Sequence, residues 1–196
     1  RERVVCFVAG TRLATPLGPR AIETLGAGDH VLTRDHGPQP VRWIGRRTVP
    51  ALGRLAPIRF DTGAIGNRRP LLVSRQHRIL RQGVANALLF GQREVLVAAH
   101  HLAAGVAQDA AAEPGVPALV TYLHVMLDRH EILFAEDALA ESFFPGDAAL
   151  TSLRPAAREE LLTLFPDLRT GCLPGFQTAR TCLNPAEAKL VANAPS

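Results

Sequence analysis

The side chain best suited to covalent chemistry is a cysteine near the start of the chain. Cys6 lies in the apolar run Val-Val-Cys-Phe-Val, which ends at the pair Gly10-Thr11. A thiolate is a strong nucleophile, but a free thiol has a pKa above neutral and needs a nearby base or positive charge. The other two cysteines, Cys172 and Cys182, could form a disulfide that closes a small loop, and Cys6 would then be unpaired. The alternative is that Cys6 is a buried structural cysteine.

A hydroxyl and an imidazole follow together much later in the chain. Ser74 and His77 are three residues apart, directly after the apolar run Leu-Leu-Val. On the turn that follows a strand, two such side chains can converge on one point. An imidazole can protonate a departing amine because its pKa is near neutral. The alternative for His77 is a surface histidine, or a core histidine with its hydrogen bonds satisfied.

A third polar cluster lies between residues 120 and 136. It reads as two strands joined by a turn at Asp128, with His124 before the turn and His130 after it. A strand residue that faces outward is the alternative for His124 and Asp128.

Short apolar runs separated by glycine and proline predict the elements that must position these residues. Such spacing without long helices is typical of an all-β domain. We expect strands at residues 4–8, 31–33, 41–44, 57–60, 71–74, 94–97, 120–127 and 131–135. A weak repeat, in which 21–28 resembles 98–105, indicates two similar halves. After Pro145-Gly146 the pattern changes, and 155–165 and 185–192 predict helices. We therefore expect a β domain at 1–144 and a helical extension at 145–196.

Together, and in this order, the three segments resemble the Hint (hedgehog/intein) domain family of autoprocessing modules. Cys6 to Thr11, followed by Leu-Gly-Ala-Gly-Asp-His-Val, is similar to its N-terminal block. Ser74-x-x-His77 resembles its Thr-x-x-His block, with Ser for Thr. The segment from Tyr122 to Ala135 resembles a later block, and 33–46 resembles the bacterial Hint_2-type subgroup. The resemblance covers residues 4–142.

The resemblance implies a horseshoe of antiparallel strands with pseudo-two-fold halves, and self-cleavage of the bond between Val5 and Cys6. In this reaction the thiol attacks the Val5 carbonyl, and an N-to-S acyl shift gives a thioester that water, an amine or a thiol can cleave. The implied catalytic residues are Cys6, Ser74, His77 and His130, and the possible accessory residues are His124, Asp128 and Thr11. The resemblance implies a single turnover, with no cofactor and no metal.

Two departures from the family pattern limit the reaction. Splicing inteins end in His-Asn, whereas this chain has Glu141-Ser142 at the corresponding point and then continues. We therefore expect no Asn-dependent cleavage at the C-terminal side. Leu123 replaces the aspartate of the block after Tyr122, which removes its acid/base assistance. These departures keep open the alternative of a non-catalytic β module in a large bacterial secreted or surface protein.

Composition argues against several other functions. The chain has 196 residues, 47% of them apolar, which is enough for a sizeable core. Its net charge of +4 is thinly spread and aromatic residues make up 5%, so nucleic-acid binding is not expected. No apolar stretch is long enough to span a membrane, and no signal peptide opens the chain. Because it starts at Arg1, we expect a piece of a longer precursor whose upstream segment is the partner cleaved.

Two rival sites have some support in the residues. Asp61-Thr62-Gly63 matches the tripeptide of aspartic peptidases, but those enzymes need a second such aspartate. A metal site is the second rival. Its candidate ligands are Cys6 and the histidines His77, His100, His101, His124 and His130. We expect the adjacent pair His100-His101 to point to opposite faces of a strand and so not to share one ion.

Overall fold

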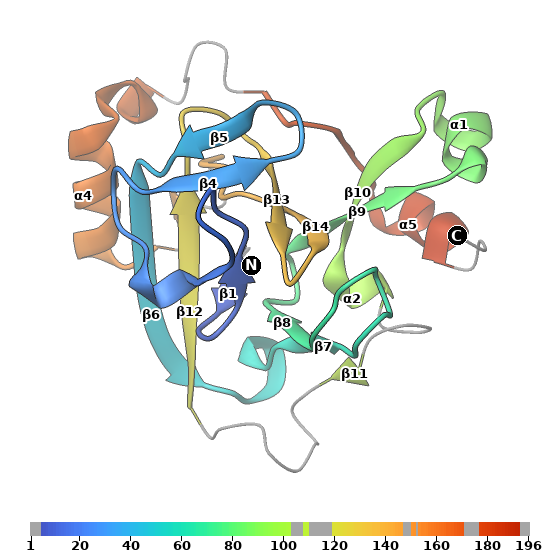
Figure 1. The fold of residues 1–196 in the computed structure, drawn as a ribbon, viewed down its shortest axis with the longest axis horizontal. Helices are drawn as coiled ribbons and strands as arrows, with labels where there is room; N and C mark the ends of the chain where they lie inside the picture. Colours follow the sequence, from blue (N-terminus) through green and yellow to red (C-terminus); the bar gives the residue numbers. More distant parts are fainter. Residues whose placement is uncertain are drawn as a thin grey trace.

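The computed structural model describes residues 5–102, 108–109, 119–146, 150–151, 153–170 and 177–192. Two sheets built mainly from antiparallel strands form the body of the molecule (Figure 1). The first sheet has the strand order β11 (Gln108–Asp109), β7 (Ile58–Phe60), β8 (Leu71–Val73), β1 (Phe7–Val8), β12 (Leu119–Met126) and β6 (Trp43–Pro50).

The second sheet combines strands from the start, the middle and the C-terminal part of the chain. Its order is β15 (Thr181–Cys182), β10 (Glu94–Ala98), β9 (Arg78–Gln82), β14 (Ala138–Glu141), β13 (Ile132–Ala135), β2 (Arg12–Leu13) and β3 (Arg20–Ala21). In addition, β4 (His30–Thr33) pairs with β13 and with β5 (Gly37–Pro40). Among the described strands, β15 alone pairs in parallel, with β10.

The helical elements are short and lie outside the sheets. They are η1 (Ile22–Thr24), η2 (Gly53–Leu55), α1 (Val84–Phe90), α2 (Ala99–Leu102), α4 (Pro155–Leu164), η4 (Pro166–Thr170) and α5 (Pro185–Ala192). No helix of the described residues is long and apolar enough to cross a bilayer. The all-β prediction with a C-terminal helical extension is confirmed.

The longest ladder joins β12 and β6, and β1 lies in the sheet between β12 and β8. Side chains alternate between the two faces of a strand. Phe7 and Leu123 accordingly face the main core, while Cys6 shares a second buried cluster with Val120 and Tyr122. This alternation decides which residues can meet Cys6.

The internal repeat corresponds to two similar strand-to-helix turns. Strand β3 leads into η1, and β10 leads into α2. Ile22 and Leu25 of the first copy, and Ala99 and Leu102 of the second, are all buried in the main core cluster. Equivalent positions of the repeat therefore pack into the same core, which supports the expectation of two similar halves.

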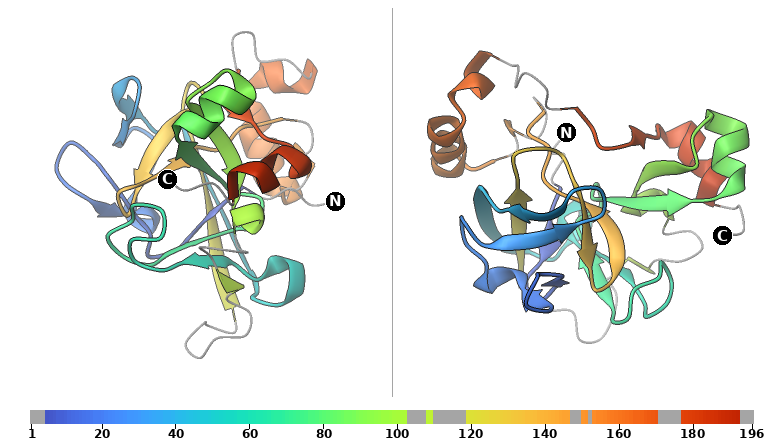
Figure 2. Two further views of the ribbon diagram at one scale, coloured as in Figure 1. Left: turned by 90° about the vertical axis from the view of Figure 1, so that its right-hand side faces the viewer. Right: turned by 45° about the horizontal axis from the view of Figure 1, so that its top comes forward.

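The C-terminal extension packs on both sides of the β body. Helix α4 lies beside β6, whereas β15 and α5 lie near β10 and α1 (Figure 2). Leu183, Ala188 and Val191 join the main core cluster. The predicted helices 155–165 and 185–192 match α4 and α5, whereas β15 was not predicted. The division at residue 144 remains a prediction.

Candidate active site

Strand register brings three of the predicted residues into one row across the first sheet. Phe7 pairs with Leu123 on β12 and with Val73 on β8. Continued by one residue, the same registers set Cys6 opposite His124 on one side and opposite Ser74 on the other. Cys6 is completely buried at this position.

Ser74 binds the backbone of Cys6 through two hydrogen bonds. The Cys6 amide N–H donates to Ser74 Oγ at 2.9 Å, and the Ser74 amide N–H donates to the Cys6 carbonyl at 2.9 Å. The second bond continues the β1–β8 pairing past the end of β8. Ser74 is therefore held against the nitrogen of the Val5–Cys6 peptide bond.

His124 contacts the other side of the same peptide bond. Its Nδ1 lies 2.8 Å from the Val5 carbonyl oxygen, which can only accept, so Nδ1 carries the hydrogen and donates. Nε2 of this neutral imidazole is then an acceptor. Cys6 Sγ lies 3.3 Å from Nδ1 and 3.4 Å from Nε2. One imidazole thus touches both the attacking sulfur and the carbonyl that it would attack.

Burial sets the charge state of the row. It raises the pKa of the Cys6 thiol well above its ordinary value, although the positive charge of Arg47 works against this. Burial also lowers the pKa of His124 to about 4, opposed by the hydrogen bond to Val5. At neutral pH the thiol is protonated and the imidazole is neutral. The thiol therefore needs a base at the moment of attack, and a neutral imidazole is available as one.

His77 is buried next to the same backbone. Both ring nitrogens are buried without a partner among the described residues. The ring packs on Phe7, with centroids 4.3 Å apart. Burial lowers the pKa of His77 to about 4, while the negative charge of Glu141 and the nearby backbone of Cys6 oppose this. Buried polar atoms without partners are rare and call for a functional explanation.

His130 belongs to a neighbouring buried cluster. Its Nδ1 accepts from the Ala179 amide at 2.9 Å, and its Nε2 lies 3.1 Å from Glu141 Oε2. Glu141 is completely buried and also contacts Arg78, with Nη1 to Oε2 at 3.2 Å. The hydrogen bonds of His130 thus lead to Glu141 and to the C-terminal extension, not to Cys6. Its catalytic role remains a prediction.

The two other accessory candidates lie outside the row. Asp128 is exposed at the β12–β13 turn and forms two hydrogen bonds with Arg42, both at 2.8 Å. Thr11 is buried in the turn after β1, where its carbonyl accepts from Ile22. The geometry gives Asp128 and Thr11 no contact with the Val5–Cys6 bond. Among the described residues, Cys182 is a free thiol, and Cys172 lies outside them.

The rival sites find little support. Asp61 is exposed and pairs with Arg59 at 2.9 Å, unlike the paired, shielded aspartates of an aspartic peptidase. Within the described ranges, no group of three His, Cys, Asp or Glu side chains could hold a metal ion. The expectation that His100 and His101 point apart on a strand was wrong. They lie inside α2, and the centroids of their rings are 3.8 Å apart, because the chain turns into a helix after β10.

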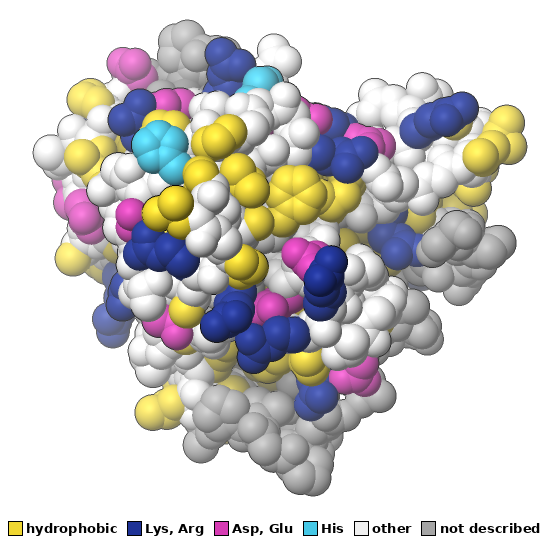
Figure 3. Space-filling view, in the orientation of Figure 1, with side chains coloured by type: hydrophobic (Ala, Val, Ile, Leu, Met, Phe, Trp, Pro, Cys, Tyr) yellow, Lys and Arg dark blue, Asp and Glu magenta, His cyan; other side chains and the backbone are white. Residues whose placement is uncertain are grey.

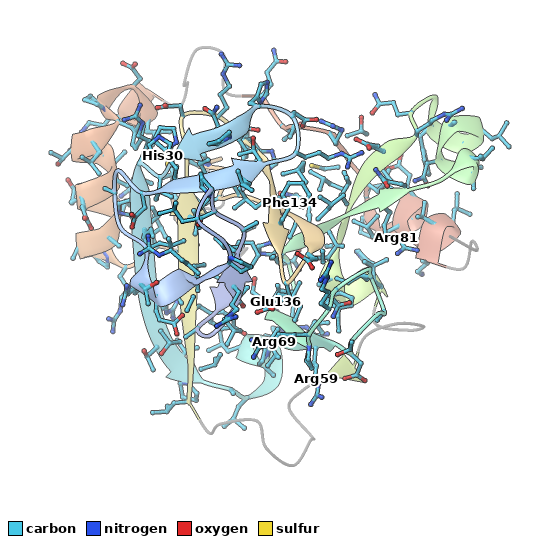
Figure 4. The ribbon with its side chains drawn as sticks, viewed as in Figure 1. His30, Arg59, Arg69, Arg81, Phe134 and Glu136 are labelled. Atoms are coloured by element: carbon cyan, nitrogen blue, oxygen red, sulfur yellow. The ribbon has the colours of Figure 1, made fainter. Side chains whose placement is uncertain are left out.

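A groove lined by three arginines and two carboxylates lies at the β13–β14 turn. It has a volume of about 260 Å³ and is lined by Arg12, Arg68, Arg69, Phe134 and Glu136, among others. Phe134 of β13, Glu136 of the turn and Arg69 from the segment before β8 are labelled in Figure 4, and basic, acidic and hydrophobic side chains adjoin on the face that Figure 3 shows. Cys6 does not line this groove.

One comparison with known proteins identifies a family. A family model described as the Hint domain (Hint_2) matches residues 5–147. The chain belongs to the Hint domain family. The family resemblance drawn from the sequence is thus confirmed. The match includes all three residues of the row, Ser74, Cys6 and His124. A comparison with curated proteins gives no match.

Solved structures similar to this Hint domain come from intein-like proteins. The bacterial intein-like domain from Clostridium thermocellum is 14% identical, with 71% of this chain and 99% of that chain covered and a TM-score of 0.42. The MchDnaB-1 intein is 17% identical, with 70% of this chain and 99% of that chain covered and a TM-score of 0.43.

The sequence alone underrated two residues of the site, His124 and Glu141. His124 was expected only as an accessory residue, yet it contacts both the thiol and the Val5 carbonyl. The signal that could have found it is its even spacing from Val120 and Tyr122, which places it on the face of Cys6. Glu141 was noted only for replacing a histidine, and its buried charge beside His77 was missed.

Proposed function

We propose that this Hint domain cleaves its own chain between Val5 and Cys6 through an N-to-S acyl shift. The observation that carries the proposal is that this peptide bond is held on both sides. His124 donates to its carbonyl oxygen at 2.8 Å, and Ser74 accepts from its amide at 2.9 Å, with the thiol beside the same imidazole. Hydrogen-bond donors aimed at a developing oxyanion are a strong contribution to acyl transfer.

The reaction balances without any added group. The bond from Cys6 Sγ to the Val5 carbonyl carbon forms, and the bond from that carbon to the Cys6 nitrogen breaks. Nε2 of His124 accepts the thiol proton, while its Nδ1–H stabilises the oxyanion. The same proton then moves from His124 to the Cys6 nitrogen, which leaves as an amine. His77, whose ring nitrogens have no other described partner, is the group that we assign to relay it, accepting a proton at one ring nitrogen as it donates one to the amine from the other.

A thioester between Val5 and Cys6 then awaits a nucleophile. Water, an amine or a thiol would release the upstream segment and leave Cys6 as the new N-terminal residue. The reaction occurs once per chain, so the domain acts on itself rather than as a turnover enzyme.

The test uses the full chain and its intact mass. After incubation with hydroxylamine or dithiothreitol, the parent should lose residues 1–5 as one fragment. Cys6→Ala should stay intact under both reagents, because the nucleophile is gone. Cys182→Ala is the matched control and should be cleaved like the parent, since Cys182 lies on β15, away from the Val5–Cys6 bond.

Two outcomes contradict the proposal. A parent chain that stays intact under both nucleophiles would favour the non-catalytic β module. Cleavage of Cys6→Ala at the same rate as the parent would show that another group does the chemistry.

A further inference from the structure

Packing holds the His124 ring in place. Trp43 stacks on the imidazole with ring centroids 6.0 Å apart and an interplanar angle of 17°. Phe143 meets it edge-on, with centroids 4.9 Å apart, and also contacts Trp43 at 5.8 Å. Of the residues that the structure describes, no carboxylate binds His124, whose polar partners are Val5 and Cys6. The three rings form a closed triangle, and this triangle fixes where Nδ1 points.

Gly45 makes room for this arrangement. It pairs with His124 in the β6–β12 ladder, and Trp43 precedes it by two residues on the same face. A Cβ atom at position 45 would lie 2.2 Å from Cη2 of Trp43, which no real contact allows. The indole therefore lies over Gly45. Trp43 Nε1 is buried without a hydrogen-bond partner in the described part of the chain, so stacking and apolar packing explain the position of the ring.

The C-terminal extension closes the other side of the triangle. Trp43, Met126 and Phe143 form one buried cluster with apolar residues of the extension, which are Leu150, Leu161, Leu162 and Leu168. Leu161 of α4 is completely buried there. Helix α4 begins after residue 147, where the family match ends. The extension thus supplies part of the wall behind the active-site imidazole.

We propose that helix α4 positions His124 for the acyl shift by packing against the cluster that contains Trp43 and Phe143. This inference rests on the proposed function and adds to it a role for the C-terminal extension. A carboxylate usually orients a catalytic histidine, and here an aromatic and aliphatic wall does so. Small displacements of a reacting group can reduce a rate about a hundredfold. The wall also excludes water, which keeps the imidazole neutral and able to accept the thiol proton.

The sole tryptophan of the chain offers a direct readout. A protonated imidazole stacked on an indole quenches its fluorescence, so Trp43 emission should follow the protonation of His124. The parent should show a step near pH 4, the pKa of about 4 that burial gives His124. His124→Gln should lack this step, which separates it from acid unfolding. Other groups that face the ring are Arg47, Cys6 and His77, and the same Gln variant controls for their titration.

The decisive comparison uses two leucines of the extension. Leu161→Ala opens space behind Trp43, so the fluorescence step should rise by about one pH unit toward the ordinary histidine value. The rate of Val5–Cys6 cleavage should fall about tenfold or more. Leu183→Ala is the matched control, because Leu183 is buried in the main core cluster instead. It should leave the step in place and the rate within about twofold of the parent.

A second pair protects the test against misfolding of Leu161→Ala. Trp43→Phe keeps an aromatic face and should cleave within about threefold of the parent, whereas Trp43→Leu should lose about tenfold or more. The proposal that α4 positions His124 is overturned if the fluorescence step of Leu161→Ala stays near pH 4, or if the step of Leu183→Ala shifts by the same amount. Equal cleavage rates of Trp43→Phe and Trp43→Leu would also overturn it. A parent that never cleaves contradicts the proposed function instead, and the fluorescence titration still decides whether α4 controls His124.

Discussion

At the scale of single residues, three side chains surround the Val5–Cys6 bond in different states. Ser74 and His124 each form a hydrogen bond with it, while the ring of His77 forms none within the described structure. Hydrogen bonds that exist before the reaction stabilise the resting bond as well as the transition state. A group that gains its partner only as the amide breaks acts on the transition state alone.

His77→Ala should therefore slow thiol-induced cleavage by about 10²–10⁴-fold, the usual loss for a general acid or base. Ser74→Ala should have a milder effect, because Ser74 binds the amide before and during the reaction. The rate of release of residues 1–5, followed by intact mass, measures both effects. His30→Ala is the control, since His30 is exposed on β4. An unchanged rate in folded His77→Ala would remove His77 from the mechanism.

Buried neutral histidines also make stability depend on pH. Burial lowers the pKa of His77 and of His124 to about 4, below the ordinary value of 6.5. The unfolded chain therefore binds more protons between these values, and stability present above pH 6.5 is lost as the pH falls toward 4. The free energy of unfolding should fall by up to about 1.4 kcal/mol per pH unit for each histidine.

Urea unfolding at several pH values between 7 and 4.5 checks this dependence. In His77→Gln the free energy of unfolding should depend less steeply on pH, because glutamine does not titrate and the contribution of one histidine is lost. A slope that is the same in the parent and in His77→Gln would mean that His77 is charged or exposed in the folded state.

At the scale of elements, the β13–β14 hairpin has an uncommon turn. Glu136 and Asp137 both have positive φ, 48° and 70°, which non-glycine residues seldom adopt. Two-residue hairpins of this kind favour Asn-Gly. Glu136 stays in place because its carboxylate accepts from the Arg12 amide at 2.7 Å. Within the described residues, Asp137 forms an ion pair with Arg68, and both side chains are exposed.

Asp137→Gly should therefore stabilise the fold by roughly 0.5–1 kcal/mol, since relief of the left-handed strain outweighs an exposed ion pair. Thermal unfolding measures the change. Glu136→Gly is the comparison and should destabilise, because it removes the carboxylate that caps Arg12. Equal effects of the two changes would mean that backbone strain does not control this turn.

The strand end that corresponds to the intein C-terminus is tied into the sheet. The Ser142 amide donates to the Glu131 carbonyl at 2.8 Å, and Ser142 Oγ accepts from the Glu131 amide at 2.9 Å. Serine cannot form the succinimide that asparagine forms. We therefore expect no cleavage after Ser142 and no ligation of flanking sequences. Peptide mapping of the incubated chain checks this, and a peptide that ends at residue 142 would contradict it.

At the scale of the whole molecule, the sequence predicted most of the first sheet and less of the second. Runs such as Leu71–Val73 and Leu119–Met126 are β-branched or apolar and form strands as expected. Ala-Leu-Ala-Glu at 138–141 has the composition of a helix, yet it forms β14 because the turn at Glu136-Asp137 pairs it with β13. Local propensity was overridden there by tertiary pairing.

The site was predictable in its parts but not in its arrangement. Cys6, Ser74 and His77 follow from motifs in the sequence. The importance of His124 depends on strand register, which sets it opposite both Cys6 and Gly45. Register is a long-range property, and no local pattern encodes that Trp43 would lie over Gly45. The wall supplied by α4 depends on contacts between residues more than a hundred positions apart.

The parallel strand β15 also has a consequence for how the chain behaves in solution. It adds to the outer side of β10 through Thr181 and Cys182, and Leu183 continues the pairing by donating to Leu96 at 2.9 Å. A chain that ends at residue 176 would leave β10 as a bare edge, and bare edges recruit strands from other molecules. Such a shortened chain should dimerise or aggregate where the full chain does not, as light scattering at matched concentration would reveal. The last twenty residues would then protect the chain against self-association, independent of any cleavage chemistry.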